Sequence, residues 1–234
     1  MAELAPRAMA NEVHLWAVRL AESAPEVDRL WSVLSTPERA KADRLERSLE
    51  RHRFLVGHAA MRLILNEYLE GALGQRPYAY GPHGKPVLPP LGGWRDGLSF
   101  NLAHSGDWAL CAVALGRPVG VDIEYRQRRN SMERVAERIL TPAELAAFQA
   151  LAEAERVSAF FQCWTRKEAC AKADGLGLTS SLRRWEVGWT DHDQPGSGLT
   201  VRNLAVADEY LAAVAASGTD WTAHSRSWSW AGLA

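Results

Sequence analysis

The sequence lacks an excess of charge of one sign, and it has few cysteines. Its 234 residues contain 27 lysines and arginines and 28 aspartates and glutamates, a formal net charge of -1. A protein that coats nucleic acid is usually strongly basic, so this balance argues against a non-specific polyanion binder. The three cysteines form no CxxC motif and lie in apolar patterns, which predicts buried thiols in a reducing compartment rather than a disulfide framework.

Long hydrophobic runs are also missing. The longest apolar stretches, near Trp108–Leu115 and Tyr210–Ala216, are far shorter than the ~20 residues that cross a bilayer. The first residues lack the basic start and apolar core of a secretory signal. With 47% hydrophobic residues the chain has enough apolar side chains for a globular core. We therefore expect a cytoplasmic monomer that does not enter a membrane.

Strand and helix patterns alternate along the chain. Apolar segments bounded by turn residues predict strands, and hydroxyl caps followed by a proline in the first turn predict helix starts. Predicted strands are Val13–Val18, Leu98–Leu102, Trp108–Leu115, Val119–Glu124, Trp185–Trp189, Leu199–Leu204 and Tyr210–Ala216. Predicted helices begin near Thr36 and Thr141 or cover Arg53–Leu69 and Val157–Asp174, the last of these ending at Gly175.

Some of these signals recur in the same order. Thr36-Pro37 is echoed 105 residues later by Thr141-Pro142, and the strand that begins at Trp108 is echoed 102 residues later at Tyr210. The shared offset predicts an α+β fold with two similar halves, 1–117 and 118–234, related by a pseudo-two-fold. Each half would be a small, mainly antiparallel sheet packed by helices, with a ligand cleft between the halves. Coincidence between common local signals is the alternative.

Two acidic residues alternate with apolar ones on the predicted strand Val119–Glu124. Side chains on a strand point to opposite faces in turn, so Asp122 and Glu124 share one face while Val121 and Ile123 enter the core. Neighbouring carboxylates repel each other unless a cation neutralises them, and Mg²⁺ prefers such oxygen ligands. The pattern indicates either a magnesium site or a solvated acidic face.

A second charged group lies in the long helix predicted near residues 157–174. Glu168 and Lys172 are four residues apart and therefore lie on one helix face. The chain has only four lysines, and arginine supplies its other fixed cations. A lysine ammonium suits a single phosphate oxygen, so its selective use beside Glu168 indicates anion binding, and an ordinary surface ion pair is the alternative.

Two turn-forming segments also carry candidate anion ligands. In Asn101-Leu102-Ala103-His104-Ser105-Gly106, the His104 ring, the Ser105 hydroxyl and the glycine backbone can donate hydrogen bonds to an anion. Gly84-Lys85-Pro86 places a lysine in a loop rich in glycine and proline. Taken singly, each segment is more typical of an ordinary turn than of a binding site.

Taken together and in this order, the four segments resemble the 4′-phosphopantetheinyl transferase family, of the larger two-half (Sfp-like) kind. The resemblance spans roughly residues 35–216. It implies an enzyme that moves the 4′-phosphopantetheine arm of coenzyme A onto a serine of an apo acyl- or peptidyl-carrier protein, with Mg²⁺, releasing adenosine 3′,5′-bisphosphate.

The resemblance also implies roles for individual residues. Asp122, Glu124 and Glu168 would hold the metal, Glu168 or a water it orients would take the serine proton, and Lys172 would bind the pyrophosphate. His104 would contact a phosphate, with Ser105 beside it, whereas the family's contacting serine precedes the histidine and is Ala103 here. Lys85 and Pro86 would border the adenine. Arg53, with Arg39 and Lys41, would meet the 3′-phosphate.

Basic residues follow the acidic strand and suggest how a carrier protein is recruited. Arg126, Arg128, Arg129, Arg134 and Arg138 would steer an acidic carrier helix, or else form a solvated basic face. Two other functions stay open on sequence alone. One is a different Mg²⁺-dependent phosphodiester enzyme such as a nuclease. The other is a carrier-binding module without activity.

Overall fold

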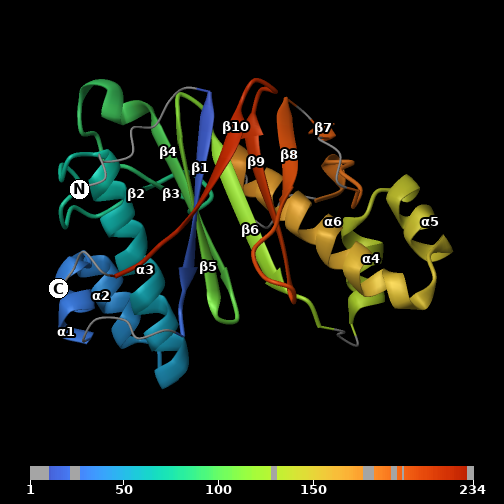
Figure 1. Cartoon of the computed structure of the whole chain (residues 1–234), viewed down its shortest axis with the longest axis horizontal. Helices are drawn as coiled ribbons and strands as arrows, with labels where there is room; N and C mark the ends of the chain where they lie inside the picture. Colours follow the sequence, from blue (N-terminus) through green and yellow to red (C-terminus); the bar gives the residue numbers. More distant parts are fainter. Residues whose placement is uncertain are drawn as a thin grey trace.

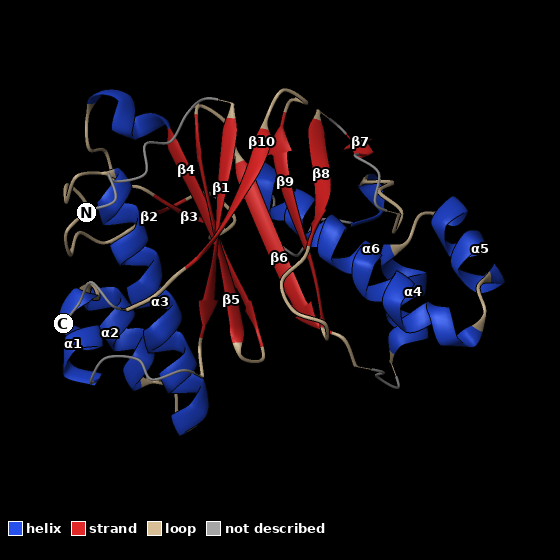
Figure 2. Ribbon diagram, in the orientation of Figure 1, coloured by secondary structure: helices blue, strands red, loops and turns tan. Residues whose placement is uncertain are grey.

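The computed structural model of this chain describes residues 11–21, 27–127, 131–175, 182–190, 194–196 and 198–230. Two four-stranded sheets stand in the middle of the molecule and helices cover their outer faces (Figure 1). The layers therefore run helix, sheet, sheet, helix, which confirms the predicted α+β class (Figure 2). Every helix in the described residues is too short or too polar to cross a bilayer.

The first sheet has the strand order β10-β1-β5-β4. Its core is an antiparallel set of β1 (Glu12–Arg19), β4 (Leu98–Ser105) and β5 (Trp108–Leu115). The helices α1 (Val27–Val33), α2 (Thr36–Asp43) and α3 (Ser48–Tyr68) cover its outer face. A small hairpin of β2 (Ala79–Tyr80) and β3 (Pro86–Val87) and a 3₁₀ turn (Gly93–Gly97) connect α3 to β4.

The second sheet repeats this arrangement with the order β6-β9-β8-β7. It contains β6 (Val119–Tyr125), β7 (Gln194–Gly196), β8 (Leu199–Leu204) and β9 (Tyr210–Ser217), and all its pairings are antiparallel. Its helices are α4 (Met132–Ile139), α5 (Pro142–Ala150) and α6 (Glu153–Asp174), followed by a 3₁₀ turn (Leu182–Arg184). The strands β1, β5 and β4 thus correspond to β6, β9 and β8, and α3 corresponds to α6.

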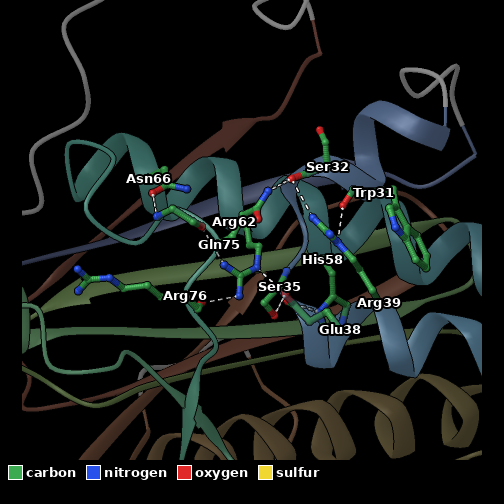
Figure 3. A network of polar contacts seen from close by, with 11 residues as sticks. Trp31, Ser32, Ser35, Glu38, Arg39, His58, Arg62, Asn66, Gln75 and Arg76 are labelled. Atoms are coloured by element: carbon green, nitrogen blue, oxygen red, sulfur yellow. Dashed lines mark hydrogen bonds and ion pairs between the residues drawn. The ribbon is translucent and has the colours of Figure 1, made fainter.

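The two halves also share a buried ion pair, which a coincidence of local signals does not explain. In the first half the capping-box residue Glu38 pairs with the fully buried Arg62 of α3, 2.5 Å between Oε2 and Nε (Figure 3). In the second half the capping-box residue Glu144 pairs with the fully buried Lys167 of α6, at 2.7 Å. Each pair ties the short capped helix to the long helix, so the internal repetition extends to the packing.

Each buried cation also holds the loop that follows its long helix. Arg62 donates to the carbonyls of Gly74 and Arg76, at 3.0 and 2.9 Å. Lys167 donates to the carbonyls of Leu182 and Trp185. A charged group taken out of water is tolerated only when its hydrogen-bonding capacity is used in this way.

Small and β-branched residues fill the space between the two sheets. The inward faces of β1, β5, β6 and β9 form one cluster there, whose members include Leu15, Ala112, Val121, Ile123 and Val214. The outer faces of the sheets pack on α3 and on α6 in two separate clusters. The two halves therefore bury a common apolar layer.

The last described strand crosses from the second half to the first. β10 (Thr222–Ser227) pairs in parallel with β1 at the edge of the first sheet, His224 opposite His14. Trp221 is buried between the sheets, and Trp228 and Trp230 pack against the core under α3. A division at residues 117 and 118 stays a prediction, with β10 belonging to the sheet of the preceding half.

One predicted strand is wrong. Trp185–Trp189 follows a 3₁₀ turn and forms no strand, although Trp185 and Val187 are buried. The backbone N–H groups of Val187 and Gly188 donate instead to Glu144 Oε1, at 2.8 and 3.0 Å. The apolar run predicts a strand, but no strand forms because a buried carboxylate, and not a neighbouring strand, accepts its backbone hydrogen bonds.

The helix predictions were better. α6 ends at Gly175, which has the left-handed φ of +71°, as the sequence predicted. Both long helices start earlier than predicted, α3 at Ser48 and α6 at Glu153. The small elements α1, β2 and β3 were not predicted at all.

The Glu38–Arg62 pair makes a prediction for acid stability. The pKa of Glu38 falls from 4.5 to about 2, because hydrogen bonds from His58 and Ser35 and the charge of Arg62 outweigh the effect of burial, which raises it. The folded state therefore loses this stabilisation only as the pH falls from 4.5 towards about 2. We expect Glu38→Gln to lower the free energy of unfolding at pH 7 by about 3–5 kcal/mol, since Arg62 is left unpaired.

The measurement is denaturant unfolding between pH 7 and pH 2. Glu38→Gln should lose less of its remaining stability over the acid range than the unaltered protein does. Glu50→Gln is the control, because Glu50 pairs with Arg47 on the surface and an exposed pair contributes less than about 1 kcal/mol. Equal acid slopes for Glu38→Gln and Glu50→Gln would contradict the assignment.

Candidate functional site

The contact of α6 with β6 is unusually close, and Gly120 permits it. A methyl group on Gly120 would lie 2.2 Å from the Ala169 carbonyl oxygen and 2.3 Å from the Ala173 nitrogen. Real Cβ atoms do not come this near to backbone, so only glycine lets the helix rest on the strand at this point. This contact brings Asp122, which lies two residues further along β6, towards Glu168 and Lys172, which directly precede Ala169 and Ala173 on α6.

Asp122, Glu168 and Lys172 meet in this contact. Val121 and Ile123 point the other way into the layer between the sheets, as the alternation predicted. Lys172 Nζ lies 2.5 Å from Asp122 Oδ1. Asp122 is only 5% exposed, so the solvated acidic face is wrong for this residue, and Glu168 is only 4% exposed, so it is not part of an ordinary surface ion pair.

Burial and neighbouring carboxylates raise the pKa values of Asp122 and Glu168. Burial raises the pKa of Asp122 to about 6, the charge of Glu124 adds to the rise, and Lys172 opposes it. Burial raises the pKa of Glu168 to about 7, the charges of Asp122 and Glu124 add to the rise, and Lys172 opposes it. One ammonium does not balance three acidic groups in a site shielded from water, and an additional cation would.

The residue types therefore fit a hard divalent cation. Asp122 Oδ2 is buried and has no hydrogen-bond partner in the described structure, so it is available as a ligand atom. No three His, Cys, Asp or Glu side chains of the described residues are already arranged around a common point. Asp122 Oδ1 is held by Lys172, and Glu124 Oε2 accepts from Ser105 at 3.1 Å. The metal assignment for Asp122, Glu124 and Glu168 stays a prediction.

A pocket of about 310 Å³ lies beside this site, between α2, α3, the β2–β3 hairpin and β4. Its lining carries three basic side chains and two ring residues from different elements. They are Lys41, His58, Tyr80, Pro86 and His104.

His104 links the pocket electrostatically to the β6–α6 contact. The surrounding protein lowers its pKa, and the charges of His58, Lys172, Arg53 and Lys41 lower it further. Basic groups from α2, α3, β4 and α6 thus act on one point of the surface. Such a convergence favours the binding of an anion with several charges.

Other predicted ligands lie at the edge of this region. Pro86 lines the pocket, whereas Lys85 Nζ donates to the Val119 and Ala173 carbonyls, at 2.9 and 3.4 Å, across the boundary between the halves. Burial lowers the pKa of Lys85 to about 8, against the opposing charge of Asp174. Arg39 donates to the Trp31 and Ser32 carbonyls instead of facing the pocket (Figure 3).

Ser105 and Asn101 join β4 to β6. The Ser105 hydroxyl donates to Glu124 and accepts from the Tyr125 N–H, at 3.0 Å, so its only proton is directed to Glu124 and not to a ligand. Four residues earlier on β4, Asn101 Oδ1 accepts from the Val121 N–H at 2.8 Å. Side chains of β4 thus accept hydrogen bonds from backbone N–H groups on the edge of β6 that pairs with no strand of its own sheet.

Sequence reasoning missed Asn101 and His58 as contributors to this site. The sequence contained a signal for Asn101. Strand alternation places it on the same face as Ala103, which faces the core between the sheets, and a polar residue buried there needs a hydrogen-bond partner. The signal for His58 was weak, since a histidine on an amphipathic helix is usually solvated. Its ring lies at hydrogen-bond distance from Glu38, 3.1 Å, and stacks on Phe54, which only the packing of α2 against α3 reveals.

Comparison with known proteins identifies the family. Residues 118–223 match the family model of the 4′-phosphopantetheinyl transferase superfamily. The chain is 35% identical to the 4′-phosphopantetheinyl transferase HetI of Nostoc sp. (strain PCC 7120) over 217 residues, 91% of each protein. It belongs to the 4′-phosphopantetheinyl transferase family.

A further similarity is to an enzyme of Bacillus subtilis. The chain is 29% identical to the 4′-phosphopantetheinyl transferase Sfp of strain 168, with 70% of each protein covered. This protein is therefore a 4′-phosphopantetheinyl transferase, and the two-half architecture described above is that of its family. The predicted family and enzyme class are confirmed.

The transferase should depend on Gly120 for the assembly of its site. We expect Gly120→Ala to lower the free energy of unfolding by about 1–3 kcal/mol, because the methyl group pushes α6 away from β6. Gly57→Ala is the matched control, since its methyl group would meet only Leu20 at 3.6 Å, an ordinary contact. Alanine is also the better residue inside a helix by about 0.5–1 kcal/mol.

Denaturant unfolding of both variants measures the difference. Gly120→Ala should also lose transferase activity beyond its loss of stability, because Glu168 and Lys172 move with the helix. If Gly120→Ala proves as stable and as active as Gly57→Ala, the close contact is not required.

Proposed function

We propose that this transferase moves the 4′-phosphopantetheine arm of coenzyme A to a serine of an apo acyl- or peptidyl-carrier protein. The other product is adenosine 3′,5′-bisphosphate, and the reaction depends on Mg²⁺. The observation that carries this proposal is the pair of buried carboxylates, Asp122 and Glu168, with the half-buried Lys172 beside them, next to a pocket with several basic side chains.

The charge of the site supports a substrate and a metal that bind together. Coenzyme A brings several negative charges, which the buried Asp122 and Glu168 and the half-buried Glu124 alone would repel. A divalent cation on those carboxylates, with the ammonium of Lys172, would reverse the sign of the local potential, and the His104 ring, whose pKa is lowered, would donate an N–H to a phosphate. The metal and coenzyme A should therefore each strengthen the binding of the other.

Asp122, Glu124 and Glu168 would hold Mg²⁺, as donor type and the unpartnered Asp122 Oδ2 suggest. The ion, when bound, would neutralise oxygens of the pyrophosphate. Lys172 would exchange its contact with Asp122 for the pyrophosphate and stabilise the charge that develops on the leaving phosphate. Glu168, or a water that it orients, would accept the proton of the carrier serine.

The pocket would hold the nucleotide end of coenzyme A. Pro86 and Tyr80 offer apolar surface for the adenine, and Lys41 and His58 offer positive charge or N–H donors for a phosphate. Arg53 lies within electrostatic reach of His104, and its buried Nε has no hydrogen-bond partner among the described residues. A phosphate oxygen would satisfy that donor.

Exchange of single acidic groups tests the proposal. We expect Asp122→Asn and Glu168→Gln each to lower transfer at least about 100-fold, because each removes a carboxylate that no neighbour replaces. Glu155→Gln is the control, since it removes an exposed carboxylate about 20 Å away along α6, at 1.5 Å per residue. The measurement is the mass gain of purified apo-carrier proteins incubated with coenzyme A and Mg²⁺.

The metal itself is tested by removal and return. Chelation should abolish transfer, and added Mg²⁺ should restore it. Calorimetry should show tighter coenzyme A binding with Mg²⁺ than without it, and Glu168→Gln should lose this difference. A folded Glu168→Gln protein with near-normal turnover would overturn the metal assignment.

The basic face after β6 would receive the carrier protein. Arg134 and Arg138 are exposed on α4, and Arg126 donates to Ser158 at 3.0 Å, while Arg128 and Arg129 lie outside the described residues. A positive surface beside the site would speed the approach of an acidic carrier helix.

Charge reversal tests this surface. We expect Arg134→Glu with Arg138→Glu to raise the KM for the carrier about tenfold at low salt and to leave the Kd for coenzyme A unchanged. The difference should shrink at high salt, because exposed charges are screened there. A carrier KM equal to that of the unaltered enzyme at low salt would exclude the role.

A further inference from the structure

A tyrosine of the second half contacts the turn that joins β4 to β5 in the first half. Tyr210 opens β9, and its hydroxyl oxygen accepts a hydrogen bond from the Asp107 N–H at 3.2 Å. A methyl group on the preceding Gly106 would lie 2.4 Å from the same oxygen. Gly106 also has a φ of +54°, which side chains rarely adopt. The turn therefore leaves room for the Tyr210 hydroxyl because residue 106 is a glycine.

This turn carries the ion-pair partner of Arg53. Asp107 Oδ1 lies 2.6 Å from an Nη atom of Arg53, which comes from α3. The Asp107 carbonyl accepts from the Leu20 N–H at 2.8 Å, so the end of β1 holds the turn from one side. Tyr210 holds it from the other side. Arg53 is thereby fixed relative to a residue of the second half.

Arg53 has a second feature that points to a ligand. Its Nε is buried and has no hydrogen-bond partner among the described residues, while Asp107 takes one Nη. A guanidinium held at one nitrogen and unsatisfied at another is suited to an oxyanion at a defined place.

We propose that Tyr210 is a positioning residue for the transfer reaction. Its hydroxyl fixes the position of the β4–β5 turn. The Asp107–Arg53 ion pair then fixes the position of Arg53 relative to that turn. A phosphate of coenzyme A bound at Arg53 then lies at a fixed distance from Asp122 and Glu168 in the other half. This inference rests on the proposed function, because it takes coenzyme A as the ligand.

The tyrosine ring is held independently of the hydroxyl. Tyr210 packs against Tyr125 with 5.3 Å between ring centroids, and their strands pair at these two residues. Removal of the Tyr210 hydroxyl should therefore leave the ring in place. Tyr125→Phe supplies a matched control, because the negative charge of the neighbouring Glu209 raises the pKa of the Tyr125 hydroxyl, and the described hydrogen bonds join the turn to Tyr210 instead.

The test compares Tyr210→Phe with Tyr125→Phe. Loss of one neutral hydrogen bond predicts a Kd and a KM for coenzyme A about three- to tenfold higher in Tyr210→Phe. The KM for the carrier protein and the thermal midpoint should match those of Tyr125→Phe. A lower thermal midpoint with an unchanged Kd for coenzyme A would show a merely structural role and overturn the proposal.

The path through Arg53 is tested in a second background. Because the effect passes through Arg53, Tyr210→Phe should weaken coenzyme A binding no further once Arg53→Ala is present. Independent, multiplying effects of the two substitutions would overturn the proposal.

Failure of the proposed function gives a different result. If the unaltered enzyme neither binds coenzyme A nor modifies any apo-carrier protein, the proposed function falls, and this inference falls with it. If the unaltered enzyme does both and Tyr210→Phe behaves as Tyr125→Phe does, only the positioning role of Tyr210 is wrong.

Discussion

The contact between β6 and α6 at Gly120 is the constraint on which the candidate site depends. It brings Asp122 and Glu168 out of water with one lysine for compensation, and burial, with a smaller contribution from neighbouring carboxylates, raises both carboxyl pKa values. Such a site is unfavourable by itself, because buried charge has to be balanced. A cation and a polyanionic substrate together would supply that balance.

The two halves share their packing but differ in the residues at the positions of the candidate site. Both halves contain the capping-box glutamate and its buried cation, Glu38 with Arg62 and Glu144 with Lys167. The facing strands differ. Asp122 and Glu124 pair across the sheet with Ala213 and Leu211, and the corresponding residues of β1 are Trp16 and Val18, which face a hydrophobic core. The first half keeps that position apolar and offers its basic pocket instead, so each half contributes one part of the site.

Much of the local structure was predictable, because short-range physics governs it. Strand alternation placed Val121 and Ile123 opposite Asp122, the capping signals at Thr36 and Thr141 marked real helix starts, and Gly175 ended α6. The strand prediction for Trp185–Trp189 is wrong because Glu144 accepts hydrogen bonds from the backbone N–H groups of Val187 and Gly188, which lie 43 and 44 residues later in the chain. β10 was missed because its weak pattern of polar residues is stabilised by pairing with β1, the most distant strand in the chain.

The sequence by itself determined which residue types are available and which of them share a strand or helix face, since these follow from the two-residue and 3.6-residue periods of the backbone. It therefore indicated that Asp122 and Glu124 share one strand face and that Glu168 and Lys172 share one helix face, and it predicted two similar halves. Only the tertiary structure decided that α6 lies close enough to bury Asp122, that Ser105 bonds to Glu124, and that Tyr210 reaches Asp107. These contacts join segments many residues apart. Their distances depend on how whole helices and sheets pack, which no local pattern encodes.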